Sequence, residues 1–348
     1  MKQKVVVGLS GRVDSAVAAL KLKEQGYEVI GVTMITYTHD GEYEPAFVED
    51  ARQVANKLDI PFYTVDFRNE FKTRVMDYFI SEYEQGRTPN PCIMCNRYIK
   101  WEALMHRGMD FGADLIATGH YGKIIQLDNG RYSVAKSYSE GKDQSYVLYN
   151  LTQDELKRTL FPLYEYDKPT IRRIAADNGL PVADKKDSQD ICFIPDHDYA
   201  AFIQKMTGRK FEPGSFVDMD GNVLGEHKGI IHYTVGQRKG LGIAFGEPKF
   251  VVGINPDTNE VVLGSKEDLM VTKVRLKDVN FMAVPDIDKS IRATGKLRYS
   301  QKDTSCVIMK DESGVVTALF DEPMRAATPG QSAVFYTDNC ILCGGTII

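Results

Sequence analysis

The sequence predicts an α/β N-terminal domain built on a parallel sheet, followed by mainly β structure. Three observations support this fold class. Apolar, β-branched runs alternate with helically spaced segments up to about residue 120, which is typical of a parallel sheet covered by helices. A short polar loop, residues 10–15, directly follows the first apolar run. After residue 207, short alternating runs separated by turn residues replace the helical spacing and indicate all-β structure.

The alternating region divides into elements in chain order. A strand is expected over residues 4–9, and the helix that begins near Asp14 turns Val17, Leu20 and Leu22 inward. Further strands are predicted over residues 27–35, 61–67 and 114–118, helices over residues 47–58 and 69–85, and a hairpin over residues 123–136 with its turn at Asn129-Gly130. Helical spacing returns from residue 153 to about residue 206.

These changes of pattern divide the chain into three predicted domains. Residues 1–206 form the α/β domain, residues 207–271 a small central mainly-β domain, and residues 272–348 a C-terminal β-barrel. An open α/β sheet binds ligands at the carboxyl ends of its strands. We therefore expect the site near the loop that follows residue 9, close to Met34 and Gly119.

Composition narrows the class of protein. Hydrophobic residues make up 43% and charged residues 26% of the 348 residues, as in ordinary soluble domains, and no apolar run approaches a membrane span. Without a signal-peptide pattern, we expect a cytoplasmic protein with no membrane association. We also expect the protein to be a monomer. Six cysteines are too few for a disulfide scaffold in a chain of this length. The net charge of −5 argues weakly against a nucleic-acid partner, since a basic face can coexist with an acidic total.

The loop after the first strand has an unusual polar composition. It reads Ser10-Gly11-Arg12-Val13-Asp14-Ser15, which lacks the Gly-Lys-Ser/Thr of a P-loop and the Gly-x-Gly-x-x-Gly dinucleotide pattern. A loop that opens a helix presents backbone N–H groups and the positive end of the helix dipole to an anion. The stretch resembles the pyrophosphate loop, Ser-Gly-Gly-x-Asp-Ser, of enzymes that split ATP between its α and β phosphates. A strand-to-helix turn with a serine cap is the alternative.

Two cysteines occur in a polar, proline-rich segment. Cys92 and Cys95 lie within residues 87–96, where Pro89 and Pro91 predict a rigid, non-helical loop. Cys95 falls at or near the start of the next helix, so we expect the helix dipole to lower its thiol pKa and favour the reactive thiolate. Buried, inert thiols are the alternative.

The other cysteines have different surroundings. Cys192 follows Lys185-Lys186, and an electropositive loop also favours a thiolate, although its apolar neighbours leave a structural role open. Cys340 and Cys343 lie in a predicted strand, away from other candidate ligands, and we interpret them as structural.

With these segments in view, the chain resembles the tRNA-specific 2-thiouridylase (MnmA) family over nearly its full length. The matching segments, in the family's order and approximate spacing, are residues 8–15, 88–100, 117–121, 142–146, 186–194, 233–242, 298–301 and 329–336. The resemblance implies an ATP pyrophosphatase domain of the HUP type, a small central domain and a C-terminal β-barrel. Members of the family replace the C2 oxygen of the wobble uridine of certain tRNAs with sulfur.

The resemblance also implies roles for individual residues. It assigns ATP contacts to Gly8, Leu9, Ser10, Gly11, Arg12, Val13, Asp14, Ser15, Met34 and Gly119, with Asp14 helping to hold Mg²⁺ on the phosphates. It makes Cys192 the carrier of a persulfide and Cys95 a nucleophile, with Asn90, Pro91 and Cys92 meeting the target base. It assigns tRNA contacts to His120, Lys142, Asp143, Gln144, Arg298, Tyr299 and Gln331. A cysteine desulfurase, directly or through a relay protein, would supply the sulfur.

Two positions depart from the family's pattern. Arg12 stands where the family has the second loop glycine, so its side chain either obstructs the phosphates or clamps them. Cys92 stands where the family usually has an aspartate. With Cys95 and Cys192 it makes three thiols, which could hold a [4Fe–4S] cluster, or zinc with a fourth ligand, in place of the persulfide route.

Two other functions remain open from the sequence. One is a pyrophosphate-loop ATPase that adenylates a small substrate, in which the cysteines would have no role. The other is a non-catalytic tRNA-binding homologue, with Arg12 and Cys92 as marks of lost chemistry.

Overall fold

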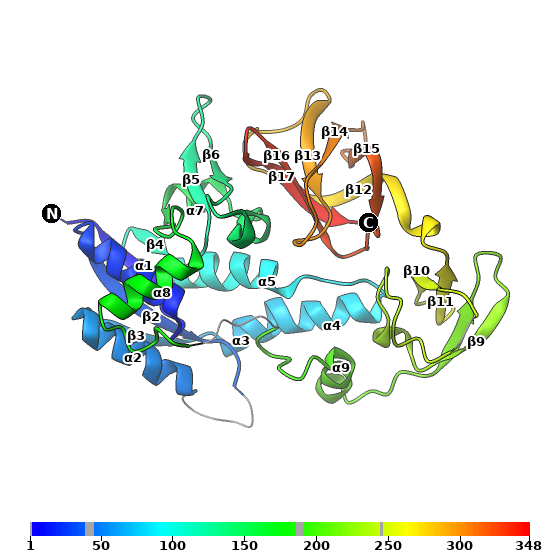
Figure 1. The fold of residues 1–348 in the computed structure, drawn as a ribbon, viewed down its shortest axis with the longest axis horizontal. Coiled ribbons are helices and arrows are strands. Elements are labelled where there is room, and N and C mark those ends of the chain that lie inside the picture. The colour runs from blue at the N-terminus through cyan, green and yellow to red at the C-terminus, as the bar shows by residue number, and fades with distance from the viewer. Residues whose placement is uncertain (1, 39–44, 186–190, 244–245) are drawn as a thin grey trace. The chain divides into compact units, whose positions relative to one another are not determined.

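A computed structural model of the chain describes residues 2–38, 45–185, 191–243 and 246–348. Figure 1 shows its ribbon. The chain divides into two compact units, which we describe separately. The first unit comprises Met1–Val75, Cys92–Phe193 and Asp338–Ile341, and the second comprises Met76–Pro91, Ile194–Thr337 and Leu342–Ile348. Across the residues that are described, no helix has the length and apolar character needed to span a membrane.

The first unit is built on a five-stranded parallel sheet with the order β3-β2-β1-β4-β7. Its strands are β1 (Lys4–Gly8), β2 (Glu28–Ile35), β3 (Phe62–Asp66), β4 (Leu115–Ala117) and β7 (Thr159–Leu160). Val5, Val6 and Val7 of the central strand are all buried, because helices cover both faces of a parallel sheet. The four strands predicted from the sequence are confirmed.

Helices and turns complete the first unit. They are α1 (Val13–Glu24), α2 (Ala46–Leu58), α3 (Arg68–Phe71), α5 (Pro91–Met94), α6 (Leu104–Asp110), α7 (Gln153–Lys157) and α8 (Lys168–Asp177), the π-helical segments η1 (Lys72–Met76) and η2 (Cys95–Ala103), and the 3-10 turns η3 (Glu140–Lys142) and η4 (Ser145–Leu148). Val17, Leu20 and Leu22 of α1 enter the core as predicted, where Val54 of α2 and Ile171 of α8 join them.

Two further predictions in this region can be compared with the structure. The hairpin is confirmed as β5 (Lys123–Gln126) and β6 (Tyr132–Ala135), with Gly130 at φ 80° in its turn. The long helix predicted over residues 69–85 is confirmed as α3, η1 and α4 (Asp77–Glu84), which follow one another without a break but change from α to π geometry in the middle.

The second unit contains the β structure predicted after residue 207. A four-stranded sheet has the order β10-β11-β8-β9. Six further strands have the order β12-β15-β14-β13-β16-β17, and pairing of β12 with β17 closes them into a barrel. The strands are β8 (Gly214–Val217), β9 (Val223–His227), β10 (Phe250–Asn255), β11 (Glu260–Gly264), β12 (Met270–Phe281), β13 (Ile291–Lys296), β14 (Thr304–Lys310), β15 (Val316–Arg325), β16 (Ser332–Thr337) and β17 (Cys340–Ile347), accompanied by α4, α9 (Tyr199–Thr207), η5 (Ile230–His232) and η6 (Glu267–Leu269).

Candidate active site

The strand order of the first unit places a ligand site at the carboxyl ends of β1 and β4. The chain leaves β1 through α1 toward β2 on one side, while β4 pairs with the other side of β1. Such a switch point leaves a crevice between the two loops. The loop of residues 10–15 follows β1, and Gly119 follows β4. The Cε atom of Met34, near the end of β2, is 3.6 Å from the position that a Cβ on Gly8 would take.

Serine side chains tie the loop of residues 10–15 into a compact turn. The Ser10 N–H donates to Ser15 Oγ at 3.1 Å, and the two hydroxyl oxygens are 3.1 Å apart. The Ser15 hydroxyl donates to the carbonyl of Arg12 at 3.1 Å. The side chain of the N-cap residue, Arg12, makes no capping hydrogen bond to the first turn of α1. Its N–H groups and dipole are therefore available to an anion, as predicted.

Two glycines allow the close packing around this loop. Gly11 has φ +67°, and a Cβ there would lie 2.4 Å from the carbonyl oxygen of Phe47. A Cβ on Gly119 would lie 2.8 Å from backbone atoms of Asp14 and Ser15. Because backbone cannot move aside as a flexible side chain can, both positions require glycine in this conformation.

Arg12 does not strain the loop. Its backbone is extended, with φ −127° and ψ 165°, a conformation open to any residue, and its side chain is exposed. The substitution of arginine for the family's second loop glycine is therefore compatible with the geometry of the backbone.

Asp14 holds a cation that the sequence analysis missed. Lys168, the first residue of α8, places its Nζ 2.8 Å and 2.7 Å from the two carboxylate oxygens of Asp14. The hydroxyl of Tyr121 donates to Asp14 Oδ1 at 2.6 Å. The carboxylate that we expected to help hold Mg²⁺ thus faces an ammonium group and a phenol. It is not an open metal ligand as placed, and its role toward Mg²⁺ stays a prediction.

Cys92 and Cys95 lie on a helix rather than in a loop. The helix begins at Pro91, and α5 runs directly into η2. The prediction of a non-helical loop was wrong from this residue onward, because proline is well suited to the first position of a helix, where its missing N–H has no partner to lose. Trp101 anchors this helix: it is fully buried, and its indole N–H donates to Thr159 Oγ1 at 2.7 Å.

The three thiols share one environment, and it keeps them protonated. Burial raises the pKa of the Cys95 thiol to about 11, and burial also raises the pKa of Cys92 and of Cys192. Negative charge on Cys95 or Cys92 would raise the pKa of Cys192 further, so the three lie within electrostatic reach of one another. Cys92 and Cys192 still have exposed surface. The thiolates expected for Cys95 and Cys192 are therefore wrong for this state, because desolvation raises both pKa values more than the positive charge of Lys100 lowers them.

Among the described residues, Lys100 is a positive charge that acts on all three of these thiols. It lowers the pKa of all three thiols, against the larger effect of burial. Its Nζ donates to Asn96 Oδ1 at 2.8 Å and lies 3.5 Å from Nε2 of His120. Asn96 in turn donates to the carbonyl of Val147 at 2.8 Å. Lys100 was not singled out in the sequence analysis. The missed signal is its position five residues after Cys95 on the same helix.

Aromatic packing holds the segment that carries Cys192. Its neighbour Phe193 is buried and packs edge-on against Phe71, with ring centroids 5.6 Å apart. Lys185 forms an ion pair with Asp50 rather than with a group near the thiol. Lys186, the second lysine of the expected electropositive loop, falls outside the described residues.

Comparison with known proteins identifies the family. Family models match a tRNA methyl transferase HUP domain over residues 3–196, a tRNA methyl transferase PRC-barrel domain over residues 200–265, and an aminomethyltransferase beta-barrel domain over residues 271–347. The tRNA-specific 2-thiouridylase MnmA of Lachnoclostridium phytofermentans is 53% identical, covering 99% of each chain. That of Clostridium perfringens is 51% identical, covering 99% of this chain and 98% of its own. The chain belongs to the tRNA-specific 2-thiouridylase family.

Solved structures resemble this 2-thiouridylase family member more weakly. The U34-tRNA thiolase NcsA from Methanococcus maripaludis with its [4Fe-4S] cluster is 20% identical, with a TM-score of 0.36, covering 59% of this chain and 64% of that chain. A 4-thiouridine synthetase–RNA complex with bound ATP is 19% identical, with a TM-score of 0.35, covering 59% of this chain and 50% of that chain. Likenesses of this size carry no argument about function.

The next question is whether the three thiols of this 2-thiouridylase family member are arranged as metal ligands. Within the described ranges, no group of three or more His, Cys, Asp or Glu side chains is arranged as a metal-ligand set. As placed, Cys92, Cys95 and Cys192 therefore do not fit a [4Fe–4S] cluster or zinc, and we derive no step through either.

Several predicted tRNA residues in the first unit make internal contacts. The Asp143 carboxylate accepts from the N–H groups of Ser137 and Ser145 at 3.0 Å and 3.2 Å, and from the Ser145 hydroxyl at 2.8 Å. Gln144 Oε1 accepts from the Tyr121 N–H at 3.0 Å. Asp143 and Gln144 thus shape the loop beside Asp14, and their role toward tRNA stays a prediction. Lys142 is half-buried.

His120 adjoins this loop and is neutral at physiological pH. Its Nδ1 lies 2.7 Å from the hydroxyl of Thr118. Burial, reinforced by the positive charge of Lys100, lowers the pKa of His120 well below its usual range. Any contact of His120 with RNA would therefore be a hydrogen bond of the neutral ring rather than an ionic bond.

The predicted tRNA residues of the second unit lie on the barrel. Arg298 donates from Nη2 to the carbonyl of Val235 at 2.9 Å and to Thr328 Oγ1 at 2.6 Å. Its neighbour Tyr299 is exposed. Gln331 follows a turn and donates to the carbonyl of Thr88 at 2.8 Å.

The turn of residues 328–331 holds the chain that leads into Pro91, and we call this contact the clasp. The Thr88 N–H donates to the carbonyl of Pro329 at 2.8 Å, opposite to the bond from Gln331. Beside it, Arg87 donates from Nε to the buried carboxylate of Glu82 at 2.7 Å. The segment that precedes the predicted base-binding residues is thereby fixed from the barrel.

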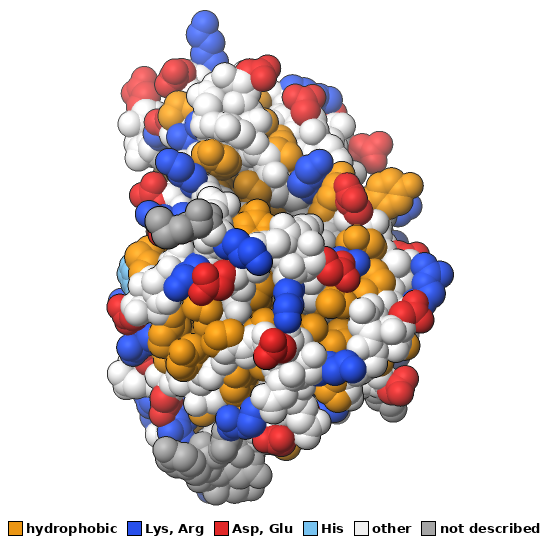
Figure 2. Space-filling model, turned by 90° about the vertical axis from the view of Figure 1, so that its left-hand side faces the viewer, with side chains coloured by type: hydrophobic (Ala, Val, Ile, Leu, Met, Phe, Trp, Pro, Cys, Tyr) orange, Lys and Arg blue, Asp and Glu red, His pale blue; other side chains and the backbone are white. Residues whose placement is uncertain are grey.

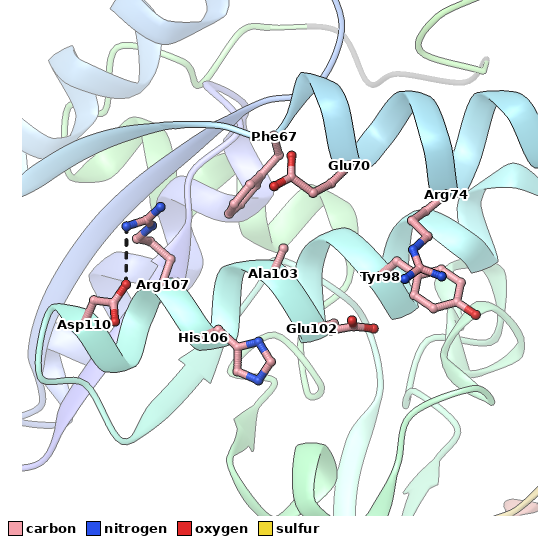
Figure 3. Close-up of a pocket in the computed structure, with 9 residues that line it drawn as sticks. All are labelled: Phe67, Glu70, Arg74, Tyr98, Glu102, Ala103, His106, Arg107 and Asp110. Atoms are coloured by element: carbon pink, nitrogen blue, oxygen red, sulfur yellow. Dashed lines mark hydrogen bonds and ion pairs between the residues drawn. The ribbon is translucent and has the colours of Figure 1, made fainter.

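Two grooves on the described surface are lined by other residues than the predicted site residues. Figure 3 shows a groove of about 320 Å³ between the helix that contains Glu70 and Arg74 and the helix that contains Tyr98, Glu102 and His106. The Arg74 guanidinium lies over the Tyr98 ring, 5.1 Å from its centroid. Charges of both signs line the groove, and none of the predicted site residues does. Figure 2 likewise shows basic and acidic side chains interspersed on one face of the molecule.

Proposed function

We propose that this chain catalyses ATP-dependent 2-thiolation of the wobble uridine of tRNA, giving 2-thiouridine. The observation that supports this best is the presence of both half-sites in the first unit: an uncapped helix start at the loop of residues 10–15, and three mutually interacting thiols next to Lys100. The relatives named as tRNA-specific 2-thiouridylases match both halves over nearly their full length.

In the first step, ATP would activate the C2 carbonyl. Oxygen O2 of the uridine attacks the α-phosphorus, the O2–P bond forms, and the bond to the bridging oxygen breaks so that pyrophosphate leaves with the electron pair. The N3 proton passes to water. The free N–H groups of α1 and the hydroxyls of Ser10 and Ser15 would bind the pyrophosphate charge. Mg²⁺ would be held mainly by phosphate oxygens and water.

In the second step, sulfur would replace the activated oxygen. A sulfur donor first leaves a persulfide on Cys192, supplied by a cysteine desulfurase directly or through a relay protein. The Cys95 thiolate attacks the Cys192 sulfur, forms the Cys95–Cys192 disulfide and releases HS⁻, which adds to C2 and expels AMP. Alternatively, the persulfide adds first and Cys95 then closes the disulfide. Either order oxidises two thiols, so an external dithiol must reduce the disulfide before the next cycle.

The thiol environment supports a division between a resting and a working state. With the pKa of Cys95 at about 11, the resting thiol is protonated at neutral pH. Loss of its proton during turnover requires a nearby cation, and Lys100 is placed to stabilise that charge.

The test is thiolation of wobble-uridine tRNA by the purified full chain with Mg²⁺–ATP, a cysteine desulfurase and a dithiol. Retardation on a mercury gel and nucleoside mass spectrometry report the product. We expect Cys95→Ser and Cys192→Ser to abolish product. The matched control is Cys306→Ala, which removes a buried barrel thiol and should retain activity. Full activity of either serine variant would contradict the mechanism.

Iron analysis tests the [4Fe–4S] alternative, which would use Cys92 as a third thiol, although the three thiols as placed do not fit a cluster. Iron and acid-labile sulfide are measured on protein purified without oxygen. About four irons per chain, with activity lost as iron is removed, would replace the persulfide route by a [4Fe–4S] mechanism. Iron-free, active protein would support the persulfide route and leave Cys92 as a base-pocket residue.

The two remaining alternatives give different patterns of ATP use. ATP–pyrophosphate exchange driven by a metabolite without tRNA would favour a small-molecule ligase. Binding of tRNA that weakens steeply with salt, without ATP turnover, would favour a non-catalytic homologue.

A further inference from the structure

One cation lies at the pyrophosphate loop without a role in the proposed function. Lys168 is 154 residues from Asp14 in the chain, yet its Nζ is within 2.8 Å of both carboxylate oxygens. The Lys168 side chain is 11% exposed and that of Asp14 is 30% exposed, so the pair faces solvent through Asp14. A long flexible side chain held this way in a polar crevice has lost most of its rotamer freedom before any ligand arrives.

The local structure fixes where the ammonium lies. Lys168 is the first residue of α8 and follows the N-cap residue, Asp167. The Oδ1 atom of Asp167 accepts a hydrogen bond from the Thr170 N–H at 2.9 Å. Ile171 of the same helix is fully buried in the core that α1 also enters. The start of α8 therefore cannot swing away from the start of α1 without opening the core.

A second network fixes Asp14 itself. Tyr121, which is 2% exposed, donates from its hydroxyl to Asp14 Oδ1 at 2.6 Å. The backbone of Tyr121 is bonded in both directions to Gln144, at 3.0 Å and 2.9 Å. Asp14 is thus held by Tyr121 from the β4 side and by Lys168 from the α8 side.

This arrangement matters because the loop must accept a polyanion. An isolated carboxylate at the mouth of an anion site would repel phosphate, whereas a paired one is neutralised. Asp14 is the acidic residue in the first turn of α1, where the uncapped N–H groups lie. The ammonium of Lys168 both cancels this charge and adds hydrogen-bond donors beside those N–H groups.

We propose that Lys168 is a phosphate-binding residue of the adenylation step, and that Asp14 positions its ammonium at the loop. The inference deepens the proposed function and rests on it, since ATP is the anion concerned. Lys168 donates hydrogen bonds to phosphate oxygens, more strongly as negative charge gathers on the departing pyrophosphate, and no bond to it forms or breaks.

The test measures nucleotide binding separately from thiolation. Titration calorimetry with α,β-methylene ATP, which cannot be split between these phosphates, gives Kd for the full chain and for Lys168→Met and Lys168→Arg. Loss of a charge-assisted phosphate contact is expected to weaken binding about tenfold or more in Lys168→Met, with partial recovery in Lys168→Arg. The matched control is Arg173→Ala, which removes one positive charge from the exposed face of the same helix.

Melting curves, compared with analogue binding, separate this role from a structural one. If Lys168→Met melts earlier but binds the analogue as wild type does, the pair is only structural and the inference is wrong. If Lys168→Met fails to fold, the comparison of Lys168→Arg with Asp14→Asn decides. We expect Asp14→Asn to weaken analogue binding because the ammonium is released, and unchanged binding would overturn the positioning role.

The same measurements distinguish failure of the proposed function from failure of the Lys168 inference. Wild-type protein that binds the analogue but makes no 2-thiouridine would contradict the proposed function and leave the Lys168 comparison valid. Wild-type protein that thiolates tRNA, with a Lys168→Met variant of unchanged analogue affinity and pyrophosphate release, would contradict the Lys168 inference alone.

Discussion

The loop of residues 10–15 and the helix of residues 91–103, which carries Cys92 and Cys95, differ in how far each is prepared for its proposed reaction. At the loop, Ser10, Ser15 and Asp14 already have hydrogen-bond partners, and the charge of Asp14 is matched by Lys168. At the helix, burial holds the Cys95 thiol in its protonated, unreactive form. An anion site can be built in advance without risk to the protein. A reactive thiolate cannot, because it oxidises or captures the wrong electrophile.

Among the variants proposed here, Gly119→Ala should have the largest effect, and this effect should be confined to nucleotide binding at the loop of residues 10–15. The added Cβ would lie 2.8 Å from backbone atoms of Asp14 and Ser15, so the loop must shift. Overpacking of this kind costs about 1–3 kcal/mol, and we expect affinity for α,β-methylene ATP to fall by up to about 100-fold. Calorimetry measures the affinity, and alkylation of Cys95 should stay at the wild-type rate. Gly141→Ala, where the added Cβ meets open space, is the control. Unchanged affinity in Gly119→Ala would contradict the packing.

The pH dependence of alkylation tests whether Cys95 is protonated in the resting protein. With the pKa of Cys95 at about 11, its alkylation at pH 8 should be at least about tenfold slower than that of a cysteine peptide, whose pKa is about 8.5. The rate should still be rising at pH 10. Mass spectrometry of iodoacetamide-treated protein follows each thiol separately. A plateau below pH 8 would mean that Cys95 rests as a thiolate.

The raised pKa of Cys95 also predicts how the stability of the protein depends on pH. A thiol whose pKa is raised by folding stabilises the native state while both states are protonated, below about pH 8.5. As the pH rises from there toward about 11, the unfolded chain loses the proton and the native chain keeps it. Denaturant unfolding should therefore show stability falling across this window. The slope should become shallower in Cys95→Ala.

Lys100→Met should change the reactivity of Cys95 and leave nucleotide binding unchanged. The positive charge of Lys100 lowers the pKa of Cys95, so its removal raises that pKa further and leaves less thiolate at a given pH. We expect alkylation of Cys95 at pH 9 to slow by about threefold to tenfold, while analogue binding is unchanged. Lys100→Arg should recover most of the rate. Equal rates in Lys100→Met and wild type would rule out Lys100 as the activating charge.

Arg12→Gly should have the smallest effect. The backbone of Arg12 is extended and needs no glycine, so restoring the family's residue should change the Kd for α,β-methylene ATP by less than about threefold. The added freedom of the unfolded chain should lower stability by about 0.4–1 kcal/mol. Calorimetry and urea unfolding measure the two quantities. A tenfold gain in affinity would mean that the side chain obstructs phosphate, and a tenfold loss that it clamps phosphate.

The sequence predicted what depends on neighbours in the chain. The apolar run before Ser10 and the polar loop that follows are local patterns, and the structure confirms the strand, the turn and the helix start. Gly119 could be placed at the same edge of the sheet, because parallel strands that alternate with helices bring their carboxyl ends together.

Long-range contacts explain what the sequence did not predict. Lys168-Pro169 indicates only a helix start, and nothing in the chain links it to Asp14 until the strand order brings α8 beside α1. The thiolate prediction failed for Cys95 for a related reason. A helix dipole can be inferred from sequence, whereas the desolvation that outweighs it depends on the packing of the whole unit.

The clasp sets a limit on how this enzyme could be divided or recombined. Glu82, Arg87 and Thr88 lie early in the chain, inside the predicted α/β domain, yet Thr88 is bonded to the turn of residues 328–331 near its end. A gene fragment ending at residue 206 would encode the segment that leads to the predicted base-binding residues without the barrel residues that hold this segment. Exchange of the barrel between relatives would have to preserve both sides of this contact.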